Sequence, residues 1–186
     1  IDEIERDEYA TLLAKFVSKC VFYDRMYHAD LHPGNIRFIK QDSKLLLGVL
    51  DFGIMGTLTK QEQNTAYCAH NFMMEQNWSE LANITIEAYI EPVSTLNNMS
   101  KTEIVTLKNR LIDAFTKPQW GYMGPDELAY LSKILSPYGL HISRKFSKLQ
   151  LAICISSSVY LTLGKHLDFA EAMKKAVYVE KPIWEI

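Results

Sequence analysis

The stretch HADLHPGN at residues 28–35, followed by DFG at residues 51–53, decides how the rest of the sequence is interpreted. The first stretch carries an H-x-D triplet, and an Asn stands five positions after its Asp. Pro33 and Gly34 interrupt regular structure, so this stretch is expected to form a loop. A second Asp opens the DFG triplet at the end of an apolar segment. The full order of these residues is far more informative than the DFG triplet alone.

The residues between the two stretches predict a β-hairpin. Ile36–Ile39 and Leu45–Leu50 have the character of short strands, and Gln41–Lys44 forms a polar turn between them. The two ends of a hairpin lie side by side. Asp51, directly after the second strand, is therefore expected to arrive beside Asn35, directly before the first.

The same residues suit phosphoryl transfer from ATP, which demands positioning and charge neutralisation more than covalent chemistry. Asp30 is placed to orient an attacking hydroxyl and to accept its proton. Asn35 and Asp51 offer oxygen ligands of the kind that magnesium prefers, Asp51 to the ion that bridges the nucleotide phosphates. The sequence therefore predicts ATP and Mg²⁺ as cofactors, Asp30 as the catalytic residue, and Asn35 and Asp51 as metal and cofactor ligands.

Around this centre the chain is expected to be mainly helical. A helix with apolar residues at helical spacing is predicted over Glu3–Tyr27. Thr59, with Glu62 three residues later, has the pattern of a capping box that begins a helix running to about Glu75. The predicted fold is mainly α with a small β-hairpin, and a helical bundle occupies residues 60–180. Further helices are predicted at residues 79–89, 101–114, 125–136, 145–163 and 168–177.

Composition excludes several classes of protein. At 186 residues, with 48% hydrophobic and 23% charged residues, the chain predicts a single globular domain. A formal net charge of −2 gives no sign of a nucleic-acid partner, which would require a basic surface. The three cysteines lie far apart without metal-binding spacing, and free thiols in a reducing compartment are expected. No signal peptide is recognised, and the apolar stretch Leu149–Leu163 is expected to be a buried helix of a soluble chain.

Three stretches resemble one family. HADLHPGNI, residues 28–36, closely resembles the catalytic-loop signature of the UbiB family, also called the ADCK-like atypical kinases. LDFGIMGTLTKQEQ, residues 50–63, looks like the family's segment from DFG into the next helix, and residues 148–168 are similar to its closing helices. The resemblance implies the C-terminal lobe of a protein-kinase-like fold over residues 1–186, with the catalytic loop and DFG triplet placed as above.

The resemblance also implies an activity. The family binds ATP and magnesium and supports biosynthesis of ubiquinone or related isoprenoid lipids, and ATP hydrolysis or small-molecule phosphoryl transfer is expected more than protein phosphorylation. By position, the catalytic and metal residues would be Asp30, Asn35 and Asp51. Membrane lipids and quinone-biosynthesis proteins are the expected partners. The expected location is a membrane, on the cytoplasmic face in bacteria or inside a mitochondrion or plastid.

Parts of the family pattern are not found between Ile1 and Ile186. These are the KxGQ segment, the Ala-rich nucleotide loop, the Lys that pairs with ATP, its Glu partner and the C-terminal membrane segment. The first four would precede Ile1. The N-terminal lobe is therefore expected to be absent, and the isolated chain is expected to be inactive.

Three residues near the predicted site are given structural roles. His28 is expected to brace the loop by packing and hydrogen bonds. His32 is expected to hold the shape of the loop or to touch the substrate. Phe52 is expected to pack beneath the magnesium site as a core residue.

Three alternatives stay open. His28, Asp30 and His32 alternate, so on a strand they would share one face and could ligate a transition metal, although Pro33 disfavours a continuing strand. Aminoglycoside and choline kinase-like phosphotransferases share a similar HGDLHPGN loop, but IMGTLTKQEQ at residues 54–63 favours UbiB. A lobe without a nucleotide clamp could also be a non-catalytic pseudokinase scaffold.

Overall fold

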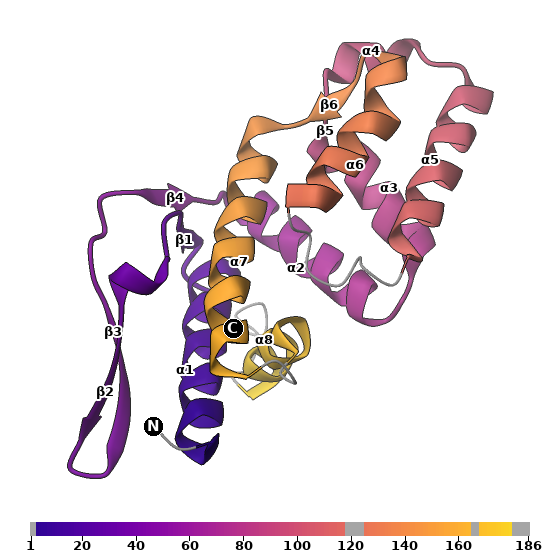
Figure 1. The fold of residues 1–186 in the computed structure, drawn as a ribbon. Helices are drawn as coiled ribbons and strands as arrows, with labels where there is room; N and C mark the ends of the chain where they lie inside the picture. Colours follow the sequence, from indigo (N-terminus) through magenta and orange to yellow (C-terminus); the bar gives the residue numbers. More distant parts are fainter. Residues whose placement is uncertain (1–2, 118–124, 165–167, 180–186) are drawn as a thin grey trace.

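The computed structural model describes residues 3–117, 125–164 and 168–179 (Figure 1). The helices are α1 Glu3–Phe22, α2 Lys60–Met74, α3 Trp78–Tyr89, α4 Val93–Asn98, α5 Lys101–Phe115, α6 Pro125–Leu135, α7 Arg144–Leu163 and α8 Phe169–Val179, with 3₁₀ turns η1 Pro33–Asn35 and η3 Ser136–Tyr138. The strands are β1 Met26–His28, β2 Ile36–Gln41, β3 Lys44–Val49, β4 Met55–Thr57, β5 Ile90–Glu91 and β6 His141–Ile142. The prediction of a mainly α fold with a small β-hairpin is confirmed. In the predicted bundle over 60–180, residues 118–124, 165–167 and 180 lie outside the described residues.

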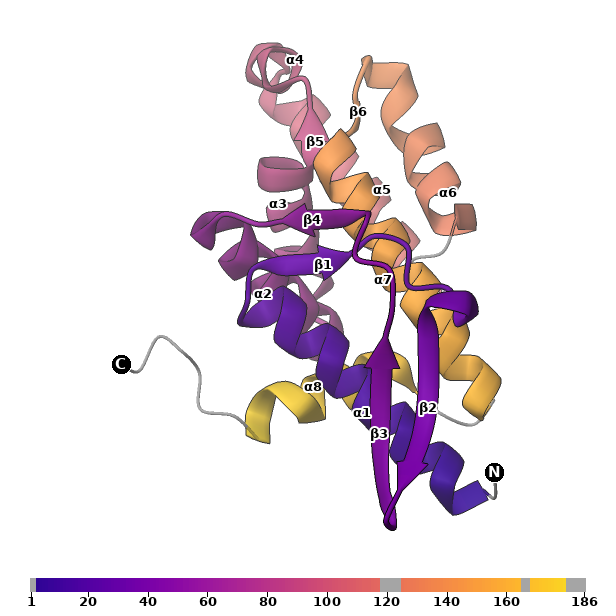
Figure 2. The same ribbon diagram turned by 90° about the vertical axis from the view of Figure 1, so that its left-hand side faces the viewer.

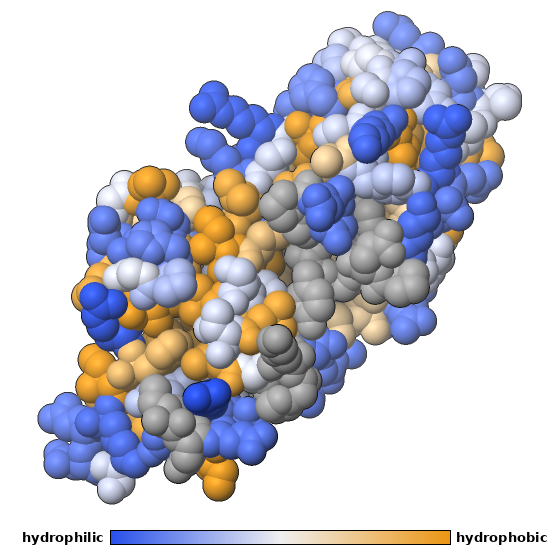
Figure 3. All heavy atoms as spheres, in the orientation of Figure 1, coloured by the Kyte–Doolittle hydropathy of each residue, from blue (hydrophilic) through white to orange (hydrophobic). Residues whose placement is uncertain are grey.

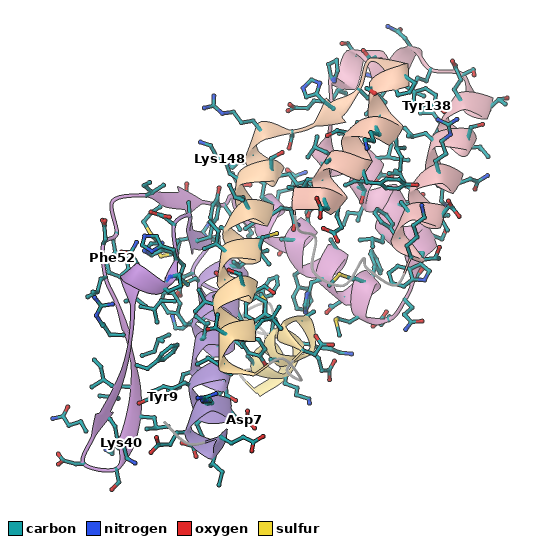
Figure 4. The ribbon with its side chains drawn as sticks, viewed as in Figure 1. Asp7, Tyr9, Lys40, Phe52, Tyr138 and Lys148 are labelled. Atoms are coloured by element: carbon teal, nitrogen blue, oxygen red, sulfur yellow. The ribbon has the colours of Figure 1, made fainter. Side chains whose placement is uncertain are left out.

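The hairpin β2–β3 runs along α1 (Figure 2). The ring of Tyr9 in α1 meets that of Phe38 in β2, with 4.8 Å between the ring centroids. Lys40, near the tip of the hairpin, forms an ion pair with Glu5 of α1. Figure 4 marks Tyr9 and Lys40 along this contact. The first helix thus supports the hairpin that carries DFG.

Two hydrophobic clusters make up the core of the described chain. The first cluster joins α1, α7, α8 and the catalytic loop, and its members include Leu13, Leu31 and Phe169. The second cluster joins α3, α5 and α6, and includes Leu107 and Leu111. α2 contributes partly buried side chains to both clusters and has no fully buried residue of its own. In Figure 1 the second cluster lies at the upper right, and the hairpin lies at the lower left.

The first helix ends earlier than predicted. α1 stops at Phe22 and not at Tyr27, and the carbonyl of Lys19 accepts hydrogen bonds from the N–H groups of Tyr23 and Asp24. Arg25 then takes a left-handed conformation with φ of 57°, and the chain continues as β1. A helix end that turns without glycine gives little signal in sequence.

The hairpin is longer and tighter than predicted. Its strands extend to Gln41 and Lys44, which pair with each other, so the turn contains two residues and not four. Asp42 and Ser43 both have positive φ, 47° and 66°, as the type I′ turn of a two-residue hairpin requires. Helix α4 and strands β5 and β6 were not predicted, because elements of two to six residues carry too little periodicity.

The helix α7 is long and apolar enough to cross a membrane by length and composition alone. Core helices of soluble proteins meet the same criterion, so this is weak evidence for a span. Phe146, Leu149, Val159 and Leu163 of α7 are buried against other parts of the chain. The expected helix over residues 149–163 is therefore present with one buried face, whereas Leu151 is 48% exposed, so the helix is only partly buried.

The three cysteines are free thiols, as expected. Cys20 is buried, whereas Cys68 and Cys154 are half-buried. Burial raises the pKa of Cys20 and that of Cys154 to about 11. The thiolate is the reactive form, so these two cysteines are inert at neutral pH.

Candidate active site

Two short strands hold the predicted catalytic segment at its ends (Figure 2). β1, before the loop, pairs antiparallel with β4, after DFG, and Tyr27 stands opposite Gly56. A hydrogen bond of 3.0 Å from the Ala29 N–H to the Ile54 carbonyl continues this pairing. The ring of Tyr27 lies so close to Gly56 that a Cβ there would be 2.0 Å from Tyr27 Cζ. Position 56 therefore requires glycine for packing.

His28 braces the loop with both ring nitrogens. Its exposure is 4%. Nδ1 accepts a hydrogen bond of 3.2 Å from the Asp30 N–H, and Nε2 lies 3.3 Å from the Leu50 carbonyl. A neutral ring that accepts at Nδ1 carries its hydrogen on Nε2, so Nε2 donates to Leu50. His28 thus ties the loop to the residue before Asp51, and its predicted structural role is confirmed.

The HPGN residues form a tight 3₁₀ turn. His32 caps this turn, because its Nδ1 accepts a hydrogen bond of 3.0 Å from the Gly34 N–H. A Cβ on residue 34 would lie 2.6 Å from His32 Cε1, so glycine makes room for the ring. The other ring nitrogen, Nε2, lies 3.7 Å from Oδ2 of Asp30. His32 therefore holds the shape of the loop and also faces the predicted catalytic carboxylate.

Asn35 forms a hydrogen bond with Asp30, five positions earlier in the chain. Its side chain Nδ2 donates a hydrogen bond of 2.9 Å to the carbonyl of Asp30, and only 8% of the residue is exposed. Its backbone N–H donates to the His32 carbonyl at 2.9 Å. The side chain of Asp30 is 43% exposed. The loop therefore has a fixed backbone and presents one carboxylate to solvent.

Asp51 reaches the same place from the hairpin. The N–H of Leu50 donates a hydrogen bond of 2.8 Å to the carbonyl of Asn35, so the ends of the hairpin meet as predicted. Asp51 has a φ of 51°, and its Oδ1 accepts a hydrogen bond of 3.0 Å from the Gly53 N–H. An Asp side chain can bond to the backbone two residues later, and Asp tolerates the left-handed backbone conformation found here. Hydrogen bonds thus join Asp30, Asn35 and Leu50, and Asp51 follows Leu50 directly in the chain, while the individual roles of the three predicted residues stay predictions.

The oxygen atoms of these residues suit a hard cation. Magnesium prefers carboxylate and amide oxygens. The hydrogen bonds above use Nδ2 of Asn35 and Oδ1 of Asp51, which leaves Oδ1 of Asn35 and Oδ2 of Asp51 for a metal. This donor set fits the predicted magnesium ligands.

The alternative transition-metal site is wrong. Both ring nitrogens of His28 face backbone groups of Asp30 and Leu50, so neither is open to a metal. The strand that would align the three side chains ends at His28, and η1 follows. Within the described ranges, no group of three or more His, Cys, Asp and Glu side chains gathers in a metal-binding arrangement.

The prediction for Phe52 is also wrong. Its side chain was expected to pack beneath the magnesium site, but 57% of the residue is exposed. One side of its ring meets His28, with 5.7 Å between the ring centroids. Its neighbours Leu50 and Ile54 are 43% and 58% exposed. Figure 4 marks Phe52 in the loop between β3 and β4, and Figure 3 shows apolar surface on this side of the molecule.

A polar bridge beside the site was not predicted. The capping box at Thr59 is present, and Glu62 accepts a hydrogen bond of 2.7 Å from the Thr59 N–H. Lys145 of α7 also binds Glu62, at 2.6 Å. Partial burial acts to raise the pKa of Glu62, but the bonds from Lys145 and Thr59 outweigh it and lower that pKa. The capping-box pattern predicted the role of Glu62 at the start of α2. It did not predict the bond to Lys145, because Lys145 lies 83 positions away in the sequence.

A helix, a loop with Asp and Asn, and a hairpin that returns to DFG define the C-terminal lobe of a protein-kinase-like fold. Comparison with known proteins agrees with this class. Residues 1–85 match the model of the family described as the ABC1 atypical kinase-like domain. This match, together with the curated relatives, confirms the resemblance of the catalytic loop to the UbiB family of atypical kinases.

Curated relatives carry the name probable protein kinase UbiB. The protein of Shewanella halifaxensis is 27% identical over 171 residues, which cover 89% of this chain and 27% of the relative. That of Xanthomonas campestris pv. campestris is 29% identical, over 80% of this chain and 27% of the relative. That of Shewanella loihica is 41% identical over 73 residues, which cover 37% of this chain and 13% of the relative. The chain spans about a quarter of the length of the first two relatives. No solved structure matches it.

Proposed function

We propose that this chain supplies the catalytic loop and the metal ligands of an ATP- and magnesium-dependent kinase or ATPase of the UbiB type. Asp30 orients the attacking hydroxyl or water and accepts its proton. Asn35 and Asp51 hold magnesium, which neutralises charge on the phosphates when bound. A half-exposed carboxylate on a fixed backbone suits the first role, and the free oxygens of Asn35 and Asp51 suit the second.

The observation that carries this proposal is the network between loop and hairpin. The side chain of Asn35 donates to the Asp30 carbonyl at 2.9 Å, and the backbone of Asn35 accepts at 2.8 Å from Leu50, the residue before Asp51. His32 adds a side-chain neighbour to the Asp30 carboxylate at 3.7 Å. Phosphoryl transfer depends mainly on such positioning, so a prearranged network is what the chemistry requires.

The proposal assigns the nucleotide clamp to another segment of a longer polypeptide. Leu50, Phe52 and Ile54 expose apolar side chains beside the predicted metal ligands. A row of exposed apolar residues marks a surface that another part covers. The chain also spans only about a quarter of its first relatives. On this basis the isolated chain is expected to be inactive.

The proposal extends to a role in the biosynthesis of ubiquinone or a related isoprenoid lipid. This part rests on the resemblance of residues 28–36 and 50–63 to the UbiB family. The corresponding partners are membrane lipids or proteins of quinone biosynthesis. The corresponding location is a membrane, on the cytoplasmic face in bacteria or inside a mitochondrion or plastid.

The test is Asp51→Asn in the full-length protein, measured as magnesium-dependent ATP turnover. Loss of the charged ligand is expected to lower turnover at least about a hundredfold. Asp42→Asn is the matched control, because Asp42 is also exposed and also has positive φ but lies in the hairpin turn. The control is expected to turn over ATP like the unchanged protein.

Two results would contradict the proposal. Equal turnover by the Asp51→Asn variant and the unchanged protein would overturn the assignment of Asp51 as a metal ligand. If the unchanged protein shows no magnesium-dependent ATP binding or turnover, the enzyme hypothesis fails and the non-catalytic scaffold hypothesis takes its place.

A further inference from the structure

A cavity of about 100 Å³ lies where the two hydrophobic clusters meet. Its described walls come from α1, α2, α3, α5, α6, α7 and α8. Phe22 and Phe169 of the first cluster and Leu81 and Leu131 of the second cluster all line it. The space therefore belongs to the interior of the helical part and not to the predicted ATP site.

α2 turns one whole helical face toward this cavity. Ala66, Ala69, His70 and Met73 line it, and their spacing is that of an apolar stripe on a helix. Such a stripe ordinarily packs into a core, yet α2 has no fully buried residue. Two of the four positions are alanine, whose short side chains leave the space open.

His70 is the unusual residue in this wall. Its Nε2 is buried without a hydrogen-bond partner among the described residues. Burial lowers the pKa of His70 to about 4, so the ring is neutral at physiological pH. A buried polar atom without a partner is rare in native proteins, and it costs about 1 to 3 kcal/mol. The described lining residues include no Asp, Glu, Lys or Arg.

We propose that this cavity binds a small neutral molecule with an apolar body and one hydroxyl group, which hydrogen-bonds to His70. This site is separate from Asp30, Asn35 and Asp51, so the proposal does not depend on the proposed function. An apolar cavity of roughly 150 Å³ in another protein holds benzene, so this cavity of about 100 Å³ takes a body of at most about one six-membered ring.

The hydroxyl group follows from the chemistry of the imidazole. A neutral ring has one nitrogen that donates and one that accepts, and a hydroxyl can serve either. The terminal torsion of histidine is broad, so the ring can turn a nitrogen toward a bound molecule. Neutrality follows from the walls, because no charged side chain in their described part would offset the burial of a charge.

The test is titration of the 186-residue chain with cyclohexanol and, as the matched probe, cyclohexane. Binding is followed by NMR of the histidine ring Cε1–H groups. Saturable binding of cyclohexanol is expected, with a shift of the His70 signal and no shift of the exposed His141. Because cyclohexane cannot hydrogen-bond, cyclohexanol is expected to bind about fivefold more tightly.

Two kinds of variant separate the role of the His70 ring nitrogen from that of the cavity volume. His70→Phe keeps a ring but removes the nitrogen, so the hydroxyl of cyclohexanol loses its partner and the preference for cyclohexanol over cyclohexane is expected to disappear or reverse. His141→Phe is the matched control and is expected to keep the fivefold preference. Ala69→Leu fills the cavity from α2 and is expected to weaken both probes at least about tenfold. Ala66→Leu, one turn earlier, makes the same test if the first filling variant does not fold.

Three results would overturn the proposal. The first is the absence of saturable binding of cyclohexanol, so that the His70 signal does not shift during the titration. The second is equal affinity of the unchanged chain for cyclohexanol and cyclohexane. The third is unchanged binding in a folded variant that fills the cavity.

Discussion

The two hydrophobic clusters use the same kinds of apolar side chain but support different structures. The first cluster carries the predicted catalytic loop, and Leu31, within that loop, is buried in it with 1% exposure. Around Leu31 the loop is held by polar bonds that require particular residues, such as His28 and Asn35. The second cluster, around Leu107 and Leu111, packs helices together and holds none of the predicted site residues.

This difference explains why one part of the protein can be recognised from short sequence motifs and the other part cannot. The family model covers residues 1–85, which contain the loop, the hairpin and DFG. A side chain that donates to one carbonyl cannot be exchanged freely, whereas an apolar core accepts many combinations of similar volume. The first region is therefore recognisable from short motifs, and the second region is not.

The largest expected effect tests whether the two clusters unfold separately. Leu111→Ala is expected to lower the free energy of unfolding of the second cluster by about 3 kcal/mol, because Leu111 has 0% exposure. Amide hydrogen exchange should become faster in α3 and α5. The amides of Ala29 and Leu50, which are hydrogen-bonded in the first region, should exchange at their original rates.

Val105→Ala, on the exposed face of α5, is the control and should change exchange little, since Val105 is 56% exposed. Faster exchange by the same factor in both regions of the Leu111→Ala variant would show one cooperative unit, and the comparison between the clusters would fail.

A smaller effect concerns pH and His70, at the boundary between the clusters. Burial holds its pKa near 4 in the folded chain, below the ordinary value of 6.5, and the charges of Lys174 and Asp168 act on it in opposite directions. Between these two pKa values the unfolded chain binds more protons. Stability should therefore be constant above about pH 7 and fall by on the order of 2 kcal/mol as the pH drops to about 4.5.

Urea unfolding at several pH values measures this fall. His70→Phe should remove it, and His141→Phe should keep it. An equal decline in all three proteins would mean that other groups cause the acid sensitivity.

The smallest effect compares the two capping boxes. Ser100→Ala should destabilise the chain by about 1 kcal/mol, because Ser100 both caps α5 and donates to Glu103 at 2.7 Å. Thr59→Ala should cost about half as much, since Lys145 still holds Glu62 in place. Thermal unfolding of the two variants measures which substitution is more destabilising. A larger loss of stability in Thr59→Ala than in Ser100→Ala would contradict the stabilising role of the bond between Lys145 and Glu62.

Sequence reasoning predicted local patterns better than long-range packing. The hairpin, the capping box at Thr59 and the meeting of Asn35 with the DFG segment all follow from spacing. β1 was missed because the chain leaves α1 through Arg25 without a glycine. Phe52 was misplaced because an apolar side chain is buried only where another surface covers it.

The cavity at His70 had no local signal at all. It depends on how seven helices pack, and the stripe on α2 looks in sequence like an ordinary core face. A histidine on such a stripe gives no sign of whether its ring nitrogen finds a partner. Such sites become visible only when the elements are assembled.

The two backbone bonds around DFG limit how Asp51 can move. Leu50 is fixed to Asn35, and Ile54 is fixed to Ala29, so residues 51–53 form a short arc with both endpoints anchored to the same loop. A swing of the hairpin tip therefore cannot carry Asp51 away from Asp30. Only local rotation within the arc changes their separation.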